Sequence, residues 1–141
     1  MLLPLPPFSP DHIHPILVNF TAALVPASVA SDIFGRLLRK PSLHSAAWWM
    51  LLYATLISPL TALAGLWWKK QAGPTLPPEI LLVHQYLGIT LALALIVLAL
   101  WRWRIFRNNV PPGPVYLLAG AFAVLALMYQ GKFGGMLLFG S

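Results

Sequence analysis

Residues 79–101 read EILLVHQYLGITLALALIVLALW. After Glu79 the stretch contains no Lys, Arg, Asp or Glu. A helix rises about 1.5 Å per residue, so about 20 apolar residues cross the roughly 30 Å hydrocarbon core of a bilayer. The stretch therefore has the length and composition of a transmembrane helix, and it predicts a membrane protein.

Three further stretches have the same character, and the four predicted spans cover residues 15–38, 45–68, 79–101 and 115–138. The 141-residue chain is 59% hydrophobic and 9% charged, which is too little charge for the surface of a soluble domain of this size. Short connections favour an up-down-up-down arrangement. We expect one all-α, four-helix transmembrane bundle over residues 1–141, with the proline-rich residues 1–14 as an irregular arm.

The net charge of +6 is unevenly distributed. Six basic residues follow the first and third spans, and three lie at the opposite membrane face: Arg36, Arg39, Lys40, Arg102, Arg104 and Arg107 against Lys69, Lys70 and Lys132. The positive-inside rule places the first group in the cytoplasm and both termini in the periplasm. We therefore expect a multi-pass protein of the bacterial cytoplasmic membrane whose charges contact lipid headgroups and not nucleic acid.

Other polar and aromatic residues have simple interpretations at this stage. The six tryptophans flank span ends and predict interfacial belts: Trp48, Trp49, Trp67, Trp68, Trp101 and Trp103. Asp32 precedes Arg36 by one helical turn, which predicts a local ion pair. His44 opens the second span and is expected at the membrane interface. With no cysteine in the chain, disulfides, iron–sulfur clusters and a cysteine nucleophile are excluded.

Two histidines fall at the same membrane face. His14 precedes Pro15 at the head of the first span, where we expect an N-cap, and His84 lies early in the third. Haem b is held between helices by axial His or Met ligands without covalent attachment. Gly88, one turn after His84, leaves space beside the ring, so His84 is the first candidate ligand of a haem b or a chlorophyll-type tetrapyrrole.

The candidate partners for His84 are His14, His12, Met136 and Lys132. In depth, Asn19 is expected closer to His84 than His14 is. An alternative interpretation needs no cofactor, because the same histidines can form hydrogen bonds between helices. No nucleophile–base pair or paired carboxylate set is visible, so enzyme activity has little support.

Four short motifs resemble a bacterial four-helix membrane family known as DUF 2231. They are residues 12–20 (HIHPILVNF), 61–67 (TALAGLW), 84–88 (HQYLG) and 131–136 (GKFGGM). The family pattern has histidine where this chain has Asn19 and Lys132, and an acidic residue where it has Met136. The resemblance implies a haem- or metal-binding cluster at one membrane face, of which this chain keeps His14 and His84.

These observations lead to three functional hypotheses. The first is a small subunit of a respiratory or photosynthetic electron-transfer complex, holding haem b near the periplasmic face through His84 and His14, with Gly88 and Met136 at the site. The second is a structural subunit without a cofactor. A small transporter or a metal-binding protein is the third. The first two imply other membrane subunits as partners.

Overall fold

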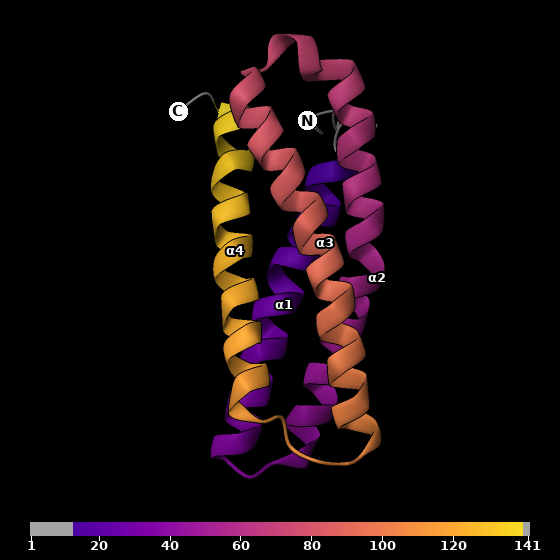
Figure 1. Ribbon diagram of the computed structural model, residues 1–141, viewed down its shortest axis with the longest axis vertical. Coiled ribbons are helices and arrows are strands. Elements are labelled where there is room, and N and C mark those ends of the chain that lie inside the picture. Colours follow the sequence, from indigo (N-terminus) through magenta and orange to yellow (C-terminus); the bar gives the residue numbers. More distant parts are fainter. Residues whose placement is uncertain (1–12, 140–141) are drawn as a thin grey trace, which may run out of the picture.

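The computed structural model describes residues 13–139, apart from the surroundings of Gly73 and the side chains of Leu138 and Phe139. Four long helices make up almost all of this part: α1 (Ile13–Leu37), α2 (Pro41–Ala72), α3 (Pro78–Arg107) and α4 (Pro114–Phe139), with a 3-10 turn, η2 (Gly73–Thr75), after α2. They run alternately up and down (Figure 1), and each is long and apolar enough to cross a membrane. The predicted all-α, four-helix membrane bundle is confirmed.

The helix starts follow from proline chemistry. α2, α3 and α4 each begin at a proline, whose missing N–H is not needed in the first turn. α1 begins at Ile13, so His14 lies inside a helix, and its predicted places at an N-cap and in an irregular arm were wrong. Residues 1–12, including the candidate ligand His12, lie outside the described residues.

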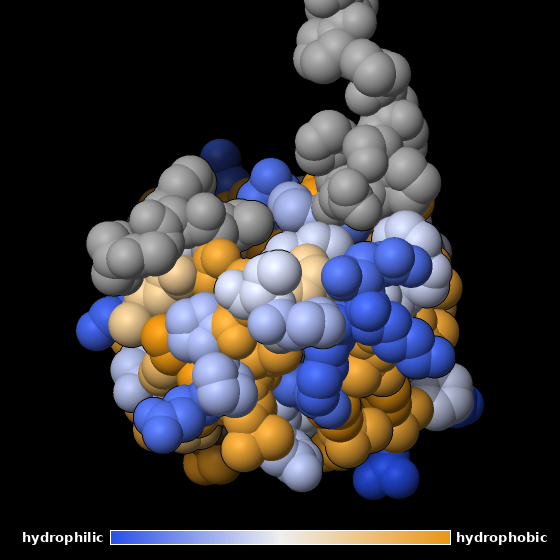
Figure 2. All heavy atoms as spheres, turned by 90° about the horizontal axis from the view of Figure 1, so that it is seen from above, coloured by the Kyte–Doolittle hydropathy of each residue, from blue (hydrophilic) through white to orange (hydrophobic). Residues whose placement is uncertain are grey.

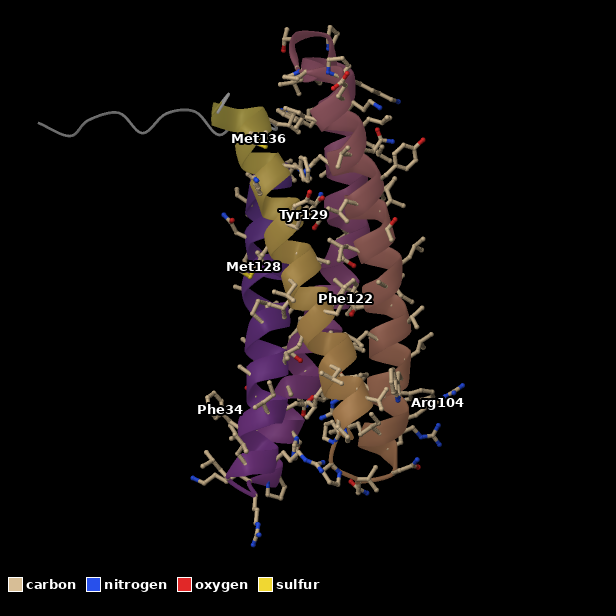
Figure 3. All side chains as sticks on the ribbon, turned by 60° about the vertical axis from the view of Figure 1, so that its left-hand side comes forward. Phe34, Arg104, Phe122, Met128, Tyr129 and Met136 are labelled. Atoms are coloured by element: carbon tan, nitrogen blue, oxygen red, sulfur yellow. The ribbon has the colours of Figure 1, made fainter. Side chains whose placement is uncertain are left out.

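The four helices form a ring of neighbours. α1 packs on α2, α2 on α3, α3 on α4, and α4 returns to α1, so α1 and α3 lie diagonally opposite one another. Large apolar side chains cover the outer surface, among them Phe122, Met128 and Tyr129 on α4 (Figure 3), which are all more than half exposed. Such an outer surface is suited to lipid.

The interior combines small residues with larger apolar ones. Val25, Leu51 and Ala54 are fully buried, and the Ser28 hydroxyl donates a hydrogen bond of 2.7 Å to the Ala47 carbonyl. Lipid tails are as apolar as leucine, so helices in a bilayer associate through close packing and hydrogen bonds. The α1–α2 contact has both features.

A buried ion pair joins α1 to α3 at the end of the bundle that carries most of the arginines, here called the arginine end. Asp32 and Arg102 are 0% and 1% exposed. Arg102 Nε and Nη2 donate to the two carboxylate oxygens at 2.9 and 3.0 Å, and Nη2 also donates to the His44 carbonyl. The His44 ring lies 2.8 Å from the same carboxylate.

This network corrects two predictions. Asp32 does not pair with Arg36, because its carboxylate oxygens are bonded to Arg102 and His44. Arg36 instead donates a hydrogen bond of 3.0 Å to the Pro112 carbonyl. His44 is also not simply an interfacial residue. Its ring packs against Gly35 of α1, where an added Cβ would lie 2.9 Å from the imidazole.

Two residues beyond helix ends adopt the left-handed conformation. Arg39, after α1, has φ 53° and Asn109, after α3, has φ 51°. Helices often end this way, but usually with glycine. A residue with a Cβ atom pays a conformational free energy of roughly 1–2 kcal/mol in this region, and asparagine adopts the region more readily than most other residues. Arg39 is therefore a locally unfavourable choice.

The ion pair gives the first testable prediction. Asp32→Ala should lower the free energy of unfolding by about 3–5 kcal/mol, because Arg102 would remain buried and charged without its partner. The double variant Asp32→Ala/Arg102→Leu should lose less than Asp32→Ala alone. Unfolding in a mild detergent measures both.

Arg104 provides the matched control for this experiment. It lies on the same helix, but it is exposed and points away from the bundle (Figure 3). Arg104→Ala should change stability by less than about 0.5 kcal/mol. An equal effect of Asp32→Ala and Arg104→Ala would contradict a structural role for the buried pair.

Candidate functional site

The ring of His14 is fixed by α2. Its Nδ1 lies 3.0 Å from the Thr61 carbonyl, and because a carbonyl only accepts, Nδ1 carries the proton. Gly65 makes room for the imidazole, since an added Cβ would lie 2.8 Å from His14 Cε1. Trp68 stacks on the other side, with ring centroids 6.4 Å apart and planes 14° from parallel. The tautomer leaves the lone pair on Nε2.

The ring of His84 is fixed by α4. An added Cβ at Gly134 would lie 3.2 Å from His84 Cε1, and one at Gly88 would lie 2.9 Å from Gln130 Nε2. Gly134 of α4 thus accommodates the His84 ring, and Gly88 of α3, one turn after His84, accommodates the Gln130 side chain. Gln130 Nε2 donates to the His84 carbonyl at 2.9 Å, which ties α3 to α4.

The two imidazoles meet across the bundle diagonal. The centroids of His14 and His84 are 6.2 Å apart, and their planes are nearly perpendicular, at 88°. Asn19 was expected to lie closer in depth to His84 than His14 is, and the contact between the two imidazoles shows that the side chain of His14 also reaches His84. The structure thus brings together the two histidines that the sequence singled out.

A cavity of about 370 Å³ adjoins this histidine pair. This volume falls within the roughly 300–1,000 Å³ range of small-molecule and cofactor pockets. The predicted residues His14, His84 and Gly88 line it, as does Asn19, whereas Met136 and Lys132 do not. Viewed from above, this end of the bundle carries hydrophilic residues over an apolar body (Figure 2).

Unpartnered polar atoms gather at the same cavity. Among the described side chains, three buried nitrogen or oxygen atoms lack a hydrogen-bond partner: Thr21 Oγ1, His84 Nδ1 and Gln130 Oε1. All three residues line the cavity. An unsatisfied buried polar group costs about 1–3 kcal/mol, so the cluster indicates a place where a polar ligand would gain partners.

Gly131 and Gly135 of α4 line one side of the cavity, here called the glycine wall. An added Cβ at either position would meet nothing within 4 Å. In the structure their faces border free space and not another helix.

Sequence reasoning missed several members of this site. Gln130 is the one amide side chain of α4, and an amide inside an apolar span is a functional candidate on that ground alone. Trp68 was assigned to an interfacial belt, but it stacks on His14. Trp48 is also turned inward, stacking on Phe106 with centroids 5.5 Å apart.

The donor set of the cavity consists of two imidazoles in a largely apolar lining. Within residues 13–139, no cluster of three or more His, Asp or Glu side chains is placed to hold a metal ion.

Fold and cavity together define a class: a four-span membrane bundle with two imidazoles at an intramembrane cavity. Residues 10–140 match the family described as "Predicted membrane protein (DUF2231)", and the chain belongs to that family. The resemblance drawn from the sequence motifs is thereby confirmed. No curated protein and no solved structure gave a significant match.

The glycine beneath His14 allows a direct test of the site geometry. Gly65→Ala should destabilise the protein by about 1–3 kcal/mol, because the new methyl group must displace the imidazole or shift the helix. Gly131→Ala is the matched control, since its methyl group enters open space and alanine favours a helix by up to about 1 kcal/mol. Thermal unfolding measures both, and equal responses would contradict the described packing.

Proposed function

We propose that this protein is a small electron-transfer subunit of the bacterial cytoplasmic membrane, and that it binds haem b between His14 and His84. The observation that carries the proposal is the imidazole pair across the bundle diagonal, with its 6.2 Å centroid separation. His14 of α1 and His84 of α3 would hold the iron of the haem, one from each side of the bundle.

The tautomer of His14 supports ligation. A ligating histidine usually donates its other ring N–H to a backbone carbonyl or carboxylate, which fixes the ring and raises its basicity. His14 Nδ1 makes this bond with Thr61, and Nε2 keeps its lone pair. The sequence resemblance pointed to the same face of the membrane.

His84 has a complementary feature. Its Nδ1 is buried and has no partner, and its Nε2 lies 3.5 Å from the Gln130 amide nitrogen. A buried ring nitrogen gains most from an occupant that satisfies it. The predicted space beside Gly88 is taken by the Gln130 amide, so room for a macrocycle edge would come from the open faces of Gly131 and Gly135 in the glycine wall.

Haem b would supply a one-electron couple at the iron. The chain itself would hold the ring in place through His14 and His84, and would exclude water with its apolar lining. A less polar environment and the hydrogen bond behind His14 would tune the reduction potential. So small a subunit, with little of the chain outside the four helices, would exchange electrons with larger membrane partners.

A second candidate function is purely structural, and one observation favours it. Each imidazole already packs on a glycine of the neighbouring helix, and His14 already has a hydrogen bond between helices. In this case the histidines only fix helix register. The two candidate functions predict different visible absorption spectra: a haem-binding protein has Soret and α bands, and a purely structural one has neither.

The haem proposal is tested by a reduced-minus-oxidised spectrum and a pyridine haemochrome assay on protein purified in mild detergent with its native partners. We expect Soret and α bands that are lost in His84→Ala. His44→Gln, a histidine substitution at the opposite end, should keep them. A folded wild-type protein without either band would refute the proposal and leave the structural candidate.

The orientation of the protein is tested separately. The chain has no cysteine, so each introduced cysteine is unique. Thr75→Cys lies in the turn after α2, and Asn108→Cys lies in the loop after α3 at the arginine end. A membrane-impermeant maleimide should label Thr75→Cys in spheroplasts and Asn108→Cys only after lysis. The reverse pattern would overturn the proposed topology.

A further inference from the structure

A second cavity, of about 640 Å³, lies at the arginine end of the bundle. It is formed where the loops after α1 and α3 meet the start of α2. Its polar lining comes from three arginines, His44, Ser45 and Asn109. None of the described residues that line it is acidic.

The charge of this cavity is only partly neutralised. Arg102 is bound on its inner side by the Asp32 carboxylate, which does not itself line the cavity. Arg36 uses one guanidinium N–H on the Pro112 carbonyl and keeps others free for further partners. Arg39 is exposed. Two guanidinium groups thus remain as excess positive charge around one hollow.

The start of α2 adds to this field. Pro41, His44 and Ser45 line the cavity within its first turn. Pro41 has no N–H, and the Leu43 N–H donates to the Lys40 carbonyl, so this end contributes the positive pole of the helix dipole and not a row of free donors. Guanidinium groups are the donors here that are suited to phosphate.

The backbone provides an independent observation. The two non-glycine residues with left-handed backbone in the described chain, Arg39 and Asn109, both line this cavity. Arg39 stands where glycine would be the more favourable residue. An unfavourable residue held at a pocket is a signature of function, because another role then outweighs its conformational cost.

We propose that this cavity binds the phosphate of an anionic phospholipid headgroup, through Arg36 and Arg39 beside the start of α2. Phe106 and Val110 line the same cavity, and Val110 is half exposed, so a bound phosphate would have apolar contacts for glycerol and acyl groups beside it. The cavity lies where α1 and α3 end and α2 begins, and all three helices are long and apolar enough to cross a membrane. Basic pockets at the ends of such helices bind anionic lipid headgroups.

Lipid is favoured over free phosphate by position. The exposed apolar residues Phe34, Leu37 and Leu38 surround this end on α1 and its following turn, so acyl chains already lie against it in a bilayer. A headgroup delivered by such a chain has a high local concentration, whereas a free ion must bind from solution.

The test separates charge from backbone conformation. Arg39→Gly removes the guanidinium and relieves the left-handed strain. It should be at least as heat-stable as wild type in phosphatidylcholine vesicles, yet lose most of the extra stability given by added phosphatidylglycerol. Its apparent affinity for phosphatidylglycerol should fall about fivefold, the effect of one basic residue at a membrane surface. Asn109→Gly relieves the same strain without removing charge, and it should respond to phosphatidylglycerol as wild type does.

Three outcomes would overturn the proposal. They are no stabilisation of wild type by phosphatidylglycerol over phosphatidylcholine, an unchanged response in Arg39→Gly, and equal stabilisation by inorganic phosphate alone. If Arg39→Gly fails to fold, Arg39→Asn replaces it, because asparagine also tolerates the left-handed conformation and carries no charge. None of these measurements depends on whether the other cavity binds haem.

Discussion

The buried pair of Asp32 and Arg102 is the interaction on which the rest of the bundle depends. It connects α1 to α3, which are diagonally opposite in the ring, and it brings the backbone carbonyl and the ring of His44 on α2 into the same network. An ion pair without full hydrogen bonding would cost more in desolvation than it returns. Here both carboxylate oxygens and three of the four helices take part, so the register of these helices is fixed at this end.

The opposite end uses the same diagonal in a different way. His14 and His84 also come from α1 and α3, but neutral imidazoles meet there beside a cavity instead of an ion pair in close packing. A glycine makes room for a histidine ring at each end: the His14 ring packs against Gly65, and the His44 ring packs against Gly35. The same number of residues separates His14 from Gly35 as separates His44 from Gly65, so one antiparallel register of α1 and α2 satisfies both contacts.

Hydropathy alone was sufficient to predict the four helices, because a bilayer demands long apolar segments whatever their packing. It was also sufficient to select His14, His84 and Gly88 as residues of one region. Partners could not be predicted in the same way. Asp32 bonds with Arg102 instead of Arg36 because α3 turns that arginine inward, and helix rotation is set by packing that no local spacing encodes. Trp68 and Gln130 were missed for the same reason, since a belt residue and a cavity residue look alike in sequence.

The two ends also differ in how completely their polar atoms are satisfied. At the arginine end Asp32 is fully bonded. At the other end Thr21 Oγ1, His84 Nδ1 and Gln130 Oε1 are left without partners, and Gly131 and Gly135 face free space. Larger apolar residues at these glycines would occupy free space but would give the unpartnered atoms no hydrogen-bond partner. Only a polar group or water beside Thr21, His84 and Gln130 would offset the cost of burying those three atoms. The polar atoms of the arginine end find their partners within the chain, whereas these three would find theirs only in an occupant of the cavity.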